Sequence, residues 1–572
     1  MKQKVYSIGI RLEDYKKFES RSPLTPSDVY DLLKFQHKNS LKIYVQKSRT
    51  EEQEVNAVYV DEAGNAHETE KIIQLPRYFV DRDFLDAGAI LVDKFPAECK
   101  VILGIKEIPH RNYFDKFNQN KVVLEMGFEP GKTYCYFSHT FKGQKYNEGM
   151  FMEMISQGCS LVDYEMIVEN ASEEKFNAVR AAIKSSPIQA PAPSKTRVGN
   201  RDYQFIRTVY FGKFAGIVGT INSLWLLGQR LKYEGISTPL ANLKQAKDYK
   251  VGRRNWELSI GDHHRNIQDY DRAKGELKKV AKELTNFEVP DDCPPFIIGI
   301  TGKSKRRSEK SHSLVLGHSA VGAKEIVDIF EGEEIKNPSE LLTKTDFQKG
   351  KVYVVYFDSD HTAKQKFEKY FPKLTVLVNC LTWEPGVDRL VTAGYLKQLY
   401  SKRNGEQFWH RIISDVSCDP GGSIEMSKDI YSTDPMYIYE PHKDVDPNLR
   451  WSNDEPGGKN DFDTLFRSTC TYGTVEGIGP VITSITNLPC ELPGESSREF
   501  SYMLKDFVLD LSKISEAPLD FKDLYEEYDM ARPIKRAIMI YRGKVTPDYA
   551  YLLNEYGSLR EYHRKNPCVW NC

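Results

Sequence analysis

The chain has almost no excess of charge of either sign. Its 80 lysines and arginines are balanced by 81 aspartates and glutamates, so the formal net charge at pH 7 is only -1. Because binding to nucleic acid or to an acidic membrane surface needs a field of positive charge, this balance argues against both kinds of partner. The composition is instead typical of an enzyme that acts on small molecules.

Long apolar runs and closely paired cysteines are also absent from the sequence. No stretch approaches the roughly 20 apolar residues that a membrane-spanning helix needs, and the start of the chain reads as a strand without the apolar core of an export signal. The ten cysteines form no CxxC pair, so we predict no metal site and expect reduced thiols. We therefore expect a cytoplasmic location, with mitochondria as the alternative.

What is present is a long alternation of apolar, β-rich runs with amphipathic stretches. A chain of 572 residues is too long for one hydrophobic core. The alternation predicts an α/β protein with two Rossmann-like domains, each a mostly parallel sheet covered by helices, around an active-site cleft. The expected strands lie at 42–46, 89–92, 101–105 and 133–137, and then at 295–302, 313–317, 351–357 and 374–379.

Changes in composition suggest where the domains begin and end. Residues 1–205 are predicted to form a substrate domain, which includes a linker-like excursion at 169–200. Residues 206–425 are predicted to bind a nucleotide, and residues 426–572 to return to the substrate domain after a polar excursion at 440–470. The glycines of an apolar helix near 211–230 are expected to pack between the domains.

Several short motifs follow one another along most of the chain. In chain order they are Arg21–Pro26, Leu103–Pro109, Phe137–Gln144, Leu161–Glu165, Arg207–Gly216, Asp415–Glu425, Val475–Gly477 and Asn487–Pro493. The first three resemble the N-terminal domain shared by alanine dehydrogenases, transhydrogenases and saccharopine dehydrogenases. The whole series resembles the lysine-ketoglutarate reductase half of the aminoadipic semialdehyde synthases.

This resemblance implies an oxidoreductase of lysine degradation. The family condenses L-lysine with 2-oxoglutarate and reduces the imine with NADPH or NADH to saccharopine. The chain would be a stand-alone first enzyme, served by a separate saccharopine dehydrogenase. Two alternatives stay open: an NAD-dependent enzyme of the same fold that forms lysine, and a degenerate homologue that acts as a scaffold or a subunit of a complex.

Two residues are candidates for moving protons during imine formation and reduction. A histidine, or a lysine in a buried site, can exchange protons near neutral pH. His139 and Lys106 each follow an apolar run, which in an open α/β sheet leads to the crevice where ligands bind. The structural alternatives are a hydrogen-bonded histidine at a strand end and a lysine that faces solvent.

The substrates carry carboxylates, which arginine binds with two parallel hydrogen bonds. Arg21 and Arg207 match family positions for this role, although Arg21 could also only brace its turn. Glu19 and Glu165 are candidates to receive the lysine amines or to polarise the neighbouring cations. Lys142, three residues after His139, is a further candidate for substrate binding.

The predicted cofactor site is interrupted. Gly302 supplies the first glycine of a phosphate-binding turn, and Gly317 and Gly322 supply the next two. The basic residues between Gly302 and Gly317 either cover the phosphates and favour NADPH, or block the site. Asp415 and Asp419 are expected to contact cofactor or substrate, or else only to form a turn. No acidic residue was found to close the second strand, so NAD and NADP both stay possible.

Overall fold

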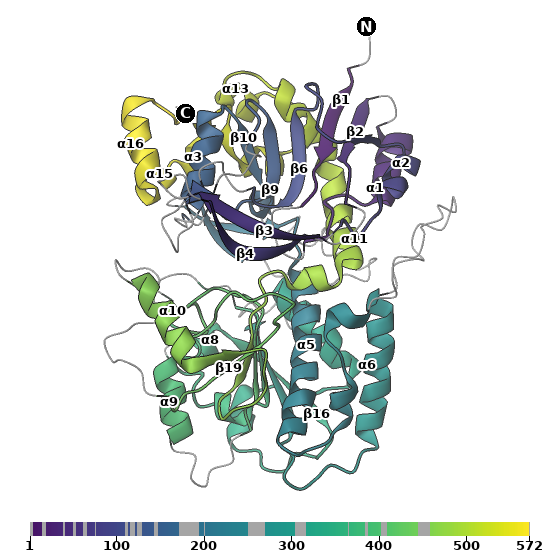
Figure 1. Cartoon of the computed structure of the whole chain (residues 1–572), viewed down its shortest axis with the longest axis vertical. Helices are drawn as coiled ribbons and strands as arrows, with labels where there is room; N and C mark the ends of the chain where they lie inside the picture. The colour runs from purple at the N-terminus through teal and green to yellow at the C-terminus, as the bar shows by residue number, and fades with distance from the viewer. Residues whose placement is uncertain are drawn as a thin grey trace.

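Two lobes stack along the long axis of the molecule (Figure 1). The computed structural model describes residues 4–13, 19–37, 40–49, 53–60, 66–74, 76–108, 113–114, 121–122, 128–141, 143, 147–170, 194–198, 201–249, 269–303, 316–363, 365–381, 383, 387–401, 409–443 and 458–570.

The first lobe is built on an eight-stranded sheet. Six neighbouring strands run parallel, and two antiparallel strands from the end of the chain extend one edge. Its central strands are buried on both faces, as expected where helices cover both sides of a parallel sheet. In sheet order the eight strands are β23 (Lys544–Val545), β22 (Ile538–Tyr541), β10 (Ser160–Asp163), β9 (Thr133–Phe137), β6 (Val101–Lys106), β1 (Tyr6–Ile10), β2 (Leu41–Gln46) and β5 (Ile90–Val92).

The second lobe repeats this plan with another eight-stranded sheet. Again six strands are parallel, and an antiparallel pair closes one edge. In sheet order they are β15 (Glu333–Glu334), β16 (Val352–Asp358), β14 (Phe296–Lys303), β17 (Val376–Asn379), β18 (Ile412–Asp415), β21 (Val481–Thr483), β19 (Tyr437–Tyr439) and β20 (Cys470–Tyr472). The two sheets confirm the predicted α/β class with two Rossmann-like units.

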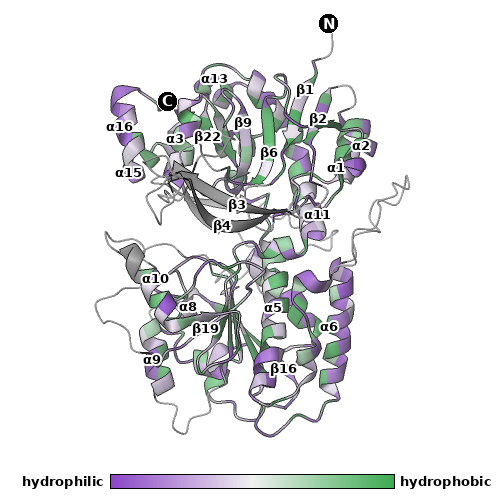
Figure 2. Ribbon diagram, in the orientation of Figure 1, coloured by the Kyte–Doolittle hydropathy of each residue, from purple (hydrophilic) through white to green (hydrophobic). Residues whose placement is uncertain are grey.

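Helices cover the faces of both sheets, and Figure 2 contrasts the mostly hydrophilic helix α16, at the outside of the first lobe, with the hydrophobic strand β6 inside it. Within the described residues, no helix has both the length and the hydropathy needed to cross a bilayer. The helices are α1 (Pro26–Asp31), α2 (Asp81–Asp86), α3 (Glu148–Ser156), α5 (Gly212–Tyr233), α6 (Asp269–Thr285), α7 (His318–Ile329), α8 (Ser359–Thr362), α9 (Ala393–Ser401), α10 (Gly458–Thr469), α11 (Pro493–Leu504), α12 (Val508–Lys513), α13 (Phe521–Glu526), α14 (Arg532–Ala537), α15 (Leu552–Glu555) and α16 (Gly557–Lys565).

Each lobe has its own hydrophobic core, and the cores show where the chain changes lobe. The core of the second lobe draws on residues from Phe214 to Leu492, whereas that of the first combines residues up to Val209 with residues from Phe500 onward. The boundary predicted at 425 therefore differs from the one in the structure. Strands β19, β20 and β21 extend the second sheet, and only the residues after them return to the first lobe.

The two predicted polar excursions contain regular structure. Part of 169–200 lies in a small antiparallel sheet of β11 (Val168–Asn170), β12 (Ser194–Val198) and β13 (Arg201–Arg207). The excursion at 440–470 contains α10. A second small sheet, drawn in Figure 1 on the side of the first lobe that faces the second, consists of β3 (Gln53–Val60), β4 (Ala66–Gln74), β7 (Tyr113–Phe114) and β8 (Lys121–Val122).

Candidate active site at the junction of the two lobes

The predicted catalytic residues lie at one edge of the first sheet. Lys106 is the last residue of β6 and is paired with Phe137, the last residue of β9, so that His139 follows just beyond it. On the other side of β9, Asp163 ends β10 and Glu165 follows by two residues. Because neighbouring strands are about 4.8 Å apart, three consecutive strands bring these side chains to one place.

The imidazole of His139 is held by a carboxylate that also binds an arginine. His139 Nδ1 lies 3.2 Å from Glu165 Oε2, and Arg207 Nη2 donates to Glu165 Oε1 at 2.8 Å. His139 adopts a φ of 54°, a left-handed conformation that is unusual for a residue other than glycine and is common at functional sites. Since Glu165 accepts the proton on Nδ1, the Nε2 atom is left to exchange protons with a substrate.

Asp163 supports the group of His139, Glu165 and Arg207. This aspartate was not identified from the sequence. Its Oδ1 accepts from the main-chain N–H of Glu165 at 2.8 Å, and its Oδ2 accepts from the Ser138 hydroxyl, so it supports the residues beside both His139 and Glu165. Burial, together with the nearby charge of Glu165, raises the pKa of Asp163 to about 6. Asp163 could have been found from the Leu161–Glu165 motif, which contains it, but only Glu165 of that motif was taken as a site residue.

Arg21 and Glu19 form a second, more deeply buried group. Arg21 donates from Nε at 2.9 Å and from Nη2 at 2.6 Å to the two oxygens of Glu19, and both side chains are at most 3% exposed. Burial alone would raise the pKa of Glu19, but the charges of Arg21 and Lys106 oppose it and leave that pKa below its usual value. The thiol of Cys490 also lies 3.3 Å from both Glu19 oxygens.

Aromatic rings join these two groups where the chain passes between the lobes. The Arg21 guanidinium lies 4.1 Å from the ring centroid of Phe211, which stacks on Phe500 at 4.3 Å. Phe500 belongs to α11, shown in yellow-green at the junction in Figure 1. Two serines of α11 accept hydrogen bonds from the main chain of residues 22 and 25. The loop that carries Arg21 is therefore fastened to both segments that connect the lobes.

On the second lobe, the interrupted glycine turn is closed. The N–H of Gly317 donates to the carbonyl of Gly302 at 3.0 Å, and Lys303 and Leu316 form an antiparallel bridge. Gly302 has a φ of +89°, and a Cβ there would lie 2.8 Å from the carbonyl oxygen of Cys380. Residues 304–315 lie outside the described part of the chain, and the described residues on either side of them are the paired Lys303 and Leu316. The interruption therefore leaves β14 followed by α7, as a dinucleotide-binding turn requires.

Gly322 lies where two helices of the second lobe pack closely. A Cβ at Gly322 would collide with the main-chain carbonyl of Lys213, and a Cβ at Gly216 would collide with that of Ser319. These two glycines allow α5 and α7 to pack with their backbones in contact. Gly322 therefore serves helix packing, and Gly216 of α5 packs within the second lobe and not between the lobes.

His318, the first residue of α7, was not selected from the sequence. Its ring lies 3.5 Å from that of Tyr210, at the first passage between the lobes. Burial, with a smaller contribution from the charge of Arg207, lowers the pKa of His318 to about 3. A neutral histidine thus connects the glycine turn of the second lobe with the arginine of the first.

Asp358 is a third residue that sequence reasoning missed. It ends β16, the strand beside β14, and is paired in register with Lys303. Its Oδ1 accepts from the N–H of Asp360 at 2.9 Å and lies 2.6 Å from His361 Nδ1, whereas its Oδ2 takes part in neither contact. The expected strand ended one residue earlier, at Phe357, so the sequence showed no clear acidic residue at its end, whereas β16 ends at Asp358.

The remaining predicted residues have other surroundings. The Asp415 carboxylate is buried and accepts from Asn379 at 2.8 Å, Ser417 at 2.7 Å and Ser427 at 2.5 Å, so it braces the loops after β17 and β18. Asp419 is half-buried in the turn that Gly422 closes, where the Gly422 N–H donates to the Asp419 carbonyl. Lys142 lies outside the described residues.

The second passage between the lobes carries a buried carboxylate without a hydrogen-bond partner. Both oxygens of Glu499, on α11, are buried and accept no hydrogen bond. Lys213 and Glu325 act on it electrostatically, but they pair with each other at 3.0 Å. Burial raises the pKa of Glu499 to about 7, whereas its ordinary value is 4.5.

The burial of Glu499 predicts that the free energy of unfolding depends on pH. Between pH 4.5 and 7 the folded protein keeps a proton that the unfolded chain has released, so the contribution of Glu499 is neutral below pH 4.5, becomes increasingly destabilising up to pH 7 and is constant above it. A Glu499→Gln variant should therefore be more stable than the wild type at pH 8, by about 3 kcal/mol, and similar to it near pH 4.5. Urea unfolding at both pH values measures the difference, with the exposed Glu516→Gln as control. Equal stability at pH 8 would contradict the prediction.

The chain resembles known proteins over nearly its whole length. No protein-family model matches it. The chain is 25% identical over 562 residues to the alpha-aminoadipic semialdehyde synthase of Arabidopsis thaliana, and 23% identical over 569 residues to the mitochondrial enzyme of the same name from Bos taurus. Each match covers 95% of this chain but only 41% and 47% of the relative, so the chain spans less than half of these proteins. These relatives confirm the resemblance drawn from the motifs.

Solved structures show a more distant likeness. An L-alanine dehydrogenase matches with a TM-score of 0.46 and 14% identity, over 97% of this chain and 99% of its own. A transhydrogenase from Sinorhizobium meliloti matches with a TM-score of 0.41 and 11% identity, over 94% of this chain and 98% of its own. At these scores the likeness adds nothing to what the two sheets show directly.

Proposed function

We propose, from the similarity to aminoadipic semialdehyde synthases, that this chain condenses L-lysine with 2-oxoglutarate and reduces the imine to saccharopine with a nicotinamide dinucleotide. The observation that carries the proposal is the meeting of Lys106, His139 and Glu165 at the ends of three neighbouring strands. Beside them lie two arginines, which suit the carboxylates of both substrates and of the product.

The glycine turn fits a dinucleotide. Gly302 and Gly317 bring the main chain close to where a pyrophosphate would lie, and the N–H groups that begin α7 point toward the same place. The strand order also reverses at β14, with β16 on one side and β17 on the other, which is where open α/β sheets bind their ligands. When bound, the cofactor supplies the hydride that reduces the imine.

The side chains of this chain would manage the protons and the charges. The lysine ε-amine must lose a proton before it attacks the keto carbon, and the carbinolamine must gain one before water leaves. His139, oriented through Nδ1, can exchange these protons at Nε2, and Lys106 offers a second amine on the neighbouring strand. Arg207 is about one-third exposed and can bind a carboxylate, while the Nη1 of Arg21 takes part in none of its contacts with Glu19.

The direct test is to mix the purified chain with L-lysine, 2-oxoglutarate and either NADPH or NADH. Oxidation of the dinucleotide that requires both substrates, with saccharopine identified by mass spectrometry, is the expected result. Dinucleotide binding by calorimetry without lysine-dependent oxidation would reject the proposed reaction. Failure to bind either dinucleotide would favour the scaffold alternative.

Asp358 favours NADH over NADPH as the cofactor. An acidic side chain at the end of the strand beside the glycine turn accepts hydrogen bonds from the adenosine ribose and repels a 2′-phosphate. This preference also lends weight to the NAD-dependent, lysine-forming direction as the second candidate function. Incubating the chain with saccharopine and NAD⁺ distinguishes the two directions by their relative rates.

Replacing Asp358 should change the choice of cofactor. An Asp358→Ser variant is expected to bind NADPH about 10- to 100-fold more tightly relative to NADH than the wild type does, because a like charge beside the 2′-phosphate is removed. Calorimetric titration with each dinucleotide measures the ratio. Asp360→Ala removes a carboxylate two residues away on the exposed side of α8 and should leave the ratio unchanged. A wild type that prefers NADPH would refute the role of Asp358.

A further inference from the structure

The strand that carries Lys106 is irregular immediately before it. Along β6 and β9, Leu103 is opposite Cys135, and the next pair is Lys106 with Phe137. Three residues of β6 therefore correspond to two residues of β9, which is a β-bulge at residues 104 and 105. Bulges turn the following side chain away from the direction that the regular sheet would give it, and they are common beside active sites. The bulge also interrupts the regular pairing of the amides near it.

The buried carboxylate of Glu13 accepts hydrogen bonds from these amides. Glu13 Oε1 accepts from the N–H of Ile105 at 2.7 Å, and Glu13 Oε2 accepts from the N–H of Lys106 at 3.1 Å. Glu13 follows β1, the strand next to β6, and its side chain is 4% exposed. Burial raises the pKa of Glu13, although the charge of Arg11 opposes this. Burying a carboxylate is costly unless it is paired and hydrogen-bonded, and these two amides supply part of that compensation.

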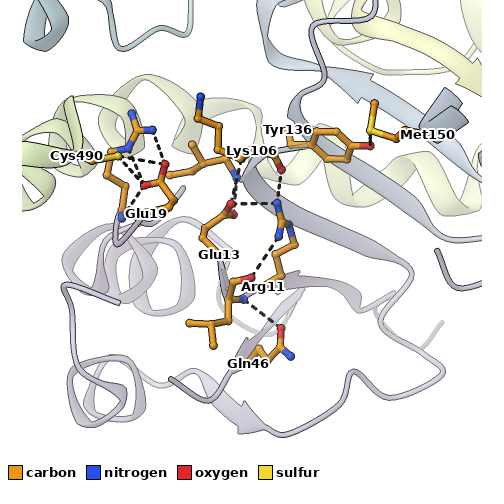
Figure 3. Close-up of polar contacts among 11 residues, drawn as sticks. Arg11, Glu13, Glu19, Gln46, Lys106, Tyr136, Met150 and Cys490 are labelled. Atoms are coloured by element: carbon orange, nitrogen blue, oxygen red, sulfur yellow. Dashed lines mark hydrogen bonds and ion pairs between the residues drawn. The ribbon is translucent and has the colours of Figure 1, made fainter. Parts of the chain in front are cut away.

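Arg11 completes the arrangement from the other side. Its Nη2 donates to Glu13 Oε2 at 3.0 Å and also to the carbonyl oxygen of Lys106. Arg11 also fills the space that a side chain at Gly104 would need, because a Cβ there would collide with the Arg11 guanidinium. The N–H and the C=O of Lys106 are thus both held, and Figure 3 shows the Lys106 amine pointing away from Glu13 and Arg11.

We infer that Arg11 and Glu13 are positioning residues that stabilise the bulge and thereby set the direction of the Lys106 side chain. The inference rests on the proposed function only for the role of Lys106 in the reaction. The geometry of the bulge, the absence of room for a side chain at Gly104 and the two hydrogen bonds to Glu13 are independent of that role. Neither Arg11 nor Glu13 needs to touch a substrate.

The first experiment measures turnover. Glu13→Gln presents an amide N–H₂ to at least one of the two main-chain amides and loses the pairing with Arg11. We expect kcat to fall about 10- to 100-fold, as for a misplaced reacting group, while KM for the dinucleotide and its calorimetric affinity stay at wild-type values. In a Lys106→Met background the same change should have almost no further effect on single-turnover rates. An equal loss in both backgrounds would overturn the inference.

The second experiment does not depend on activity. Trace acetylation with acetic anhydride, followed by peptide mass spectrometry, reports how readily each amine reacts. The Lys106 amine should react severalfold faster in Glu13→Gln than in the wild type. Gln46→Ala, which removes a different hydrogen bond to the same segment at Leu12, should match the wild type. If the wild type proves inactive, the proposed reaction fails, yet the labelling still tests the positioning. Unchanged labelling in Glu13→Gln would refute it.

Arg11→Lys keeps the measurement possible if Glu13→Gln does not fold. A lysine retains the positive charge beside Glu13 but cannot donate to both Glu13 and the Lys106 carbonyl with the geometry of a guanidinium. Its kcat and its Lys106 labelling should lie between those of the wild type and Glu13→Gln. Wild-type values for both quantities would count against Arg11 as a positioning residue.

Discussion

A His139→Ala variant is expected to turn over lysine and 2-oxoglutarate about 10²- to 10⁴-fold more slowly than the wild type, the usual contribution of a group that transfers protons in the transition state. The reason is structural, because Glu165 fixes Nδ1 and leaves only Nε2 to face a substrate. Dinucleotide affinity should be unchanged, since His139 lies on the first lobe and the glycine turn on the second. Steady-state kinetics and calorimetry on the same preparation measure both quantities.

A distant histidine provides the control for this variant. His442 is half-exposed and pairs with Glu440 at 3.2 Å, so His442→Ala removes the same side chain without touching the junction. Its turnover should equal that of the wild type. Lys106→Met should show a loss comparable to that of His139→Ala. Wild-type turnover in His139→Ala would mean that this histidine is only a structural residue at the end of a strand.

Removing Arg21 should have the largest effect on stability. An Arg21→Ala variant leaves the Glu19 carboxylate buried without its ion pair, and breaking such a pair costs about 3–5 kcal/mol of unfolding free energy. It also removes the cation that lies on the Phe211 ring at the passage between the lobes. Urea unfolding at neutral pH measures the loss. At lower pH the loss should shrink, because the orphaned Glu19 can then be protonated.

A double variant separates the charge from the packing. Arg21→Ala combined with Glu19→Gln removes both charges, and it should recover part of the stability because no unpaired carboxylate remains. The single Glu19→Gln variant, with Arg21 left buried and unpaired, should be destabilised as well. If Arg21→Ala alone unfolds at the wild-type urea concentration, the ion pair does not support the fold, and Arg21 would be a substrate-binding residue only.

The central strands were predictable because they are buried on both faces and therefore apolar throughout. The expected runs at 101–105 and 133–137 became β6 and β9, and the run at 374–379 became β17. By contrast, β19, β20 and β21 have three residues each and lie among turn residues, so no periodicity marked them. Their absence from the prediction placed the boundary between the lobes too early in the chain.

Parts of the candidate site depend on which strands are neighbours, and a single sequence does not contain that information directly. Asp358 becomes meaningful only when β16 lies beside β14, and Glu13 only when the bulge of β6 lies beside the end of β1. Gly322 was selected because its spacing suits a position where the main chain must be approached closely, and it does lie at such a position. The part of the chain that approaches it is α5, which only the fold brings there.

The divided first lobe has a consequence for how the chain is made. Strand β10 is an edge of its sheet until β22 joins it, and the Arg542 amide that binds Ser160 is 382 residues further along the chain. At ribosomal rates of about 5–20 residues per second, that interval lasts roughly 20 to 75 s. During it the second lobe, whose core is continuous in sequence, can fold while the edge of β10 stays unpaired. Because unpaired edges recruit other chains, the yield of folded protein should depend on shielding of that edge during synthesis.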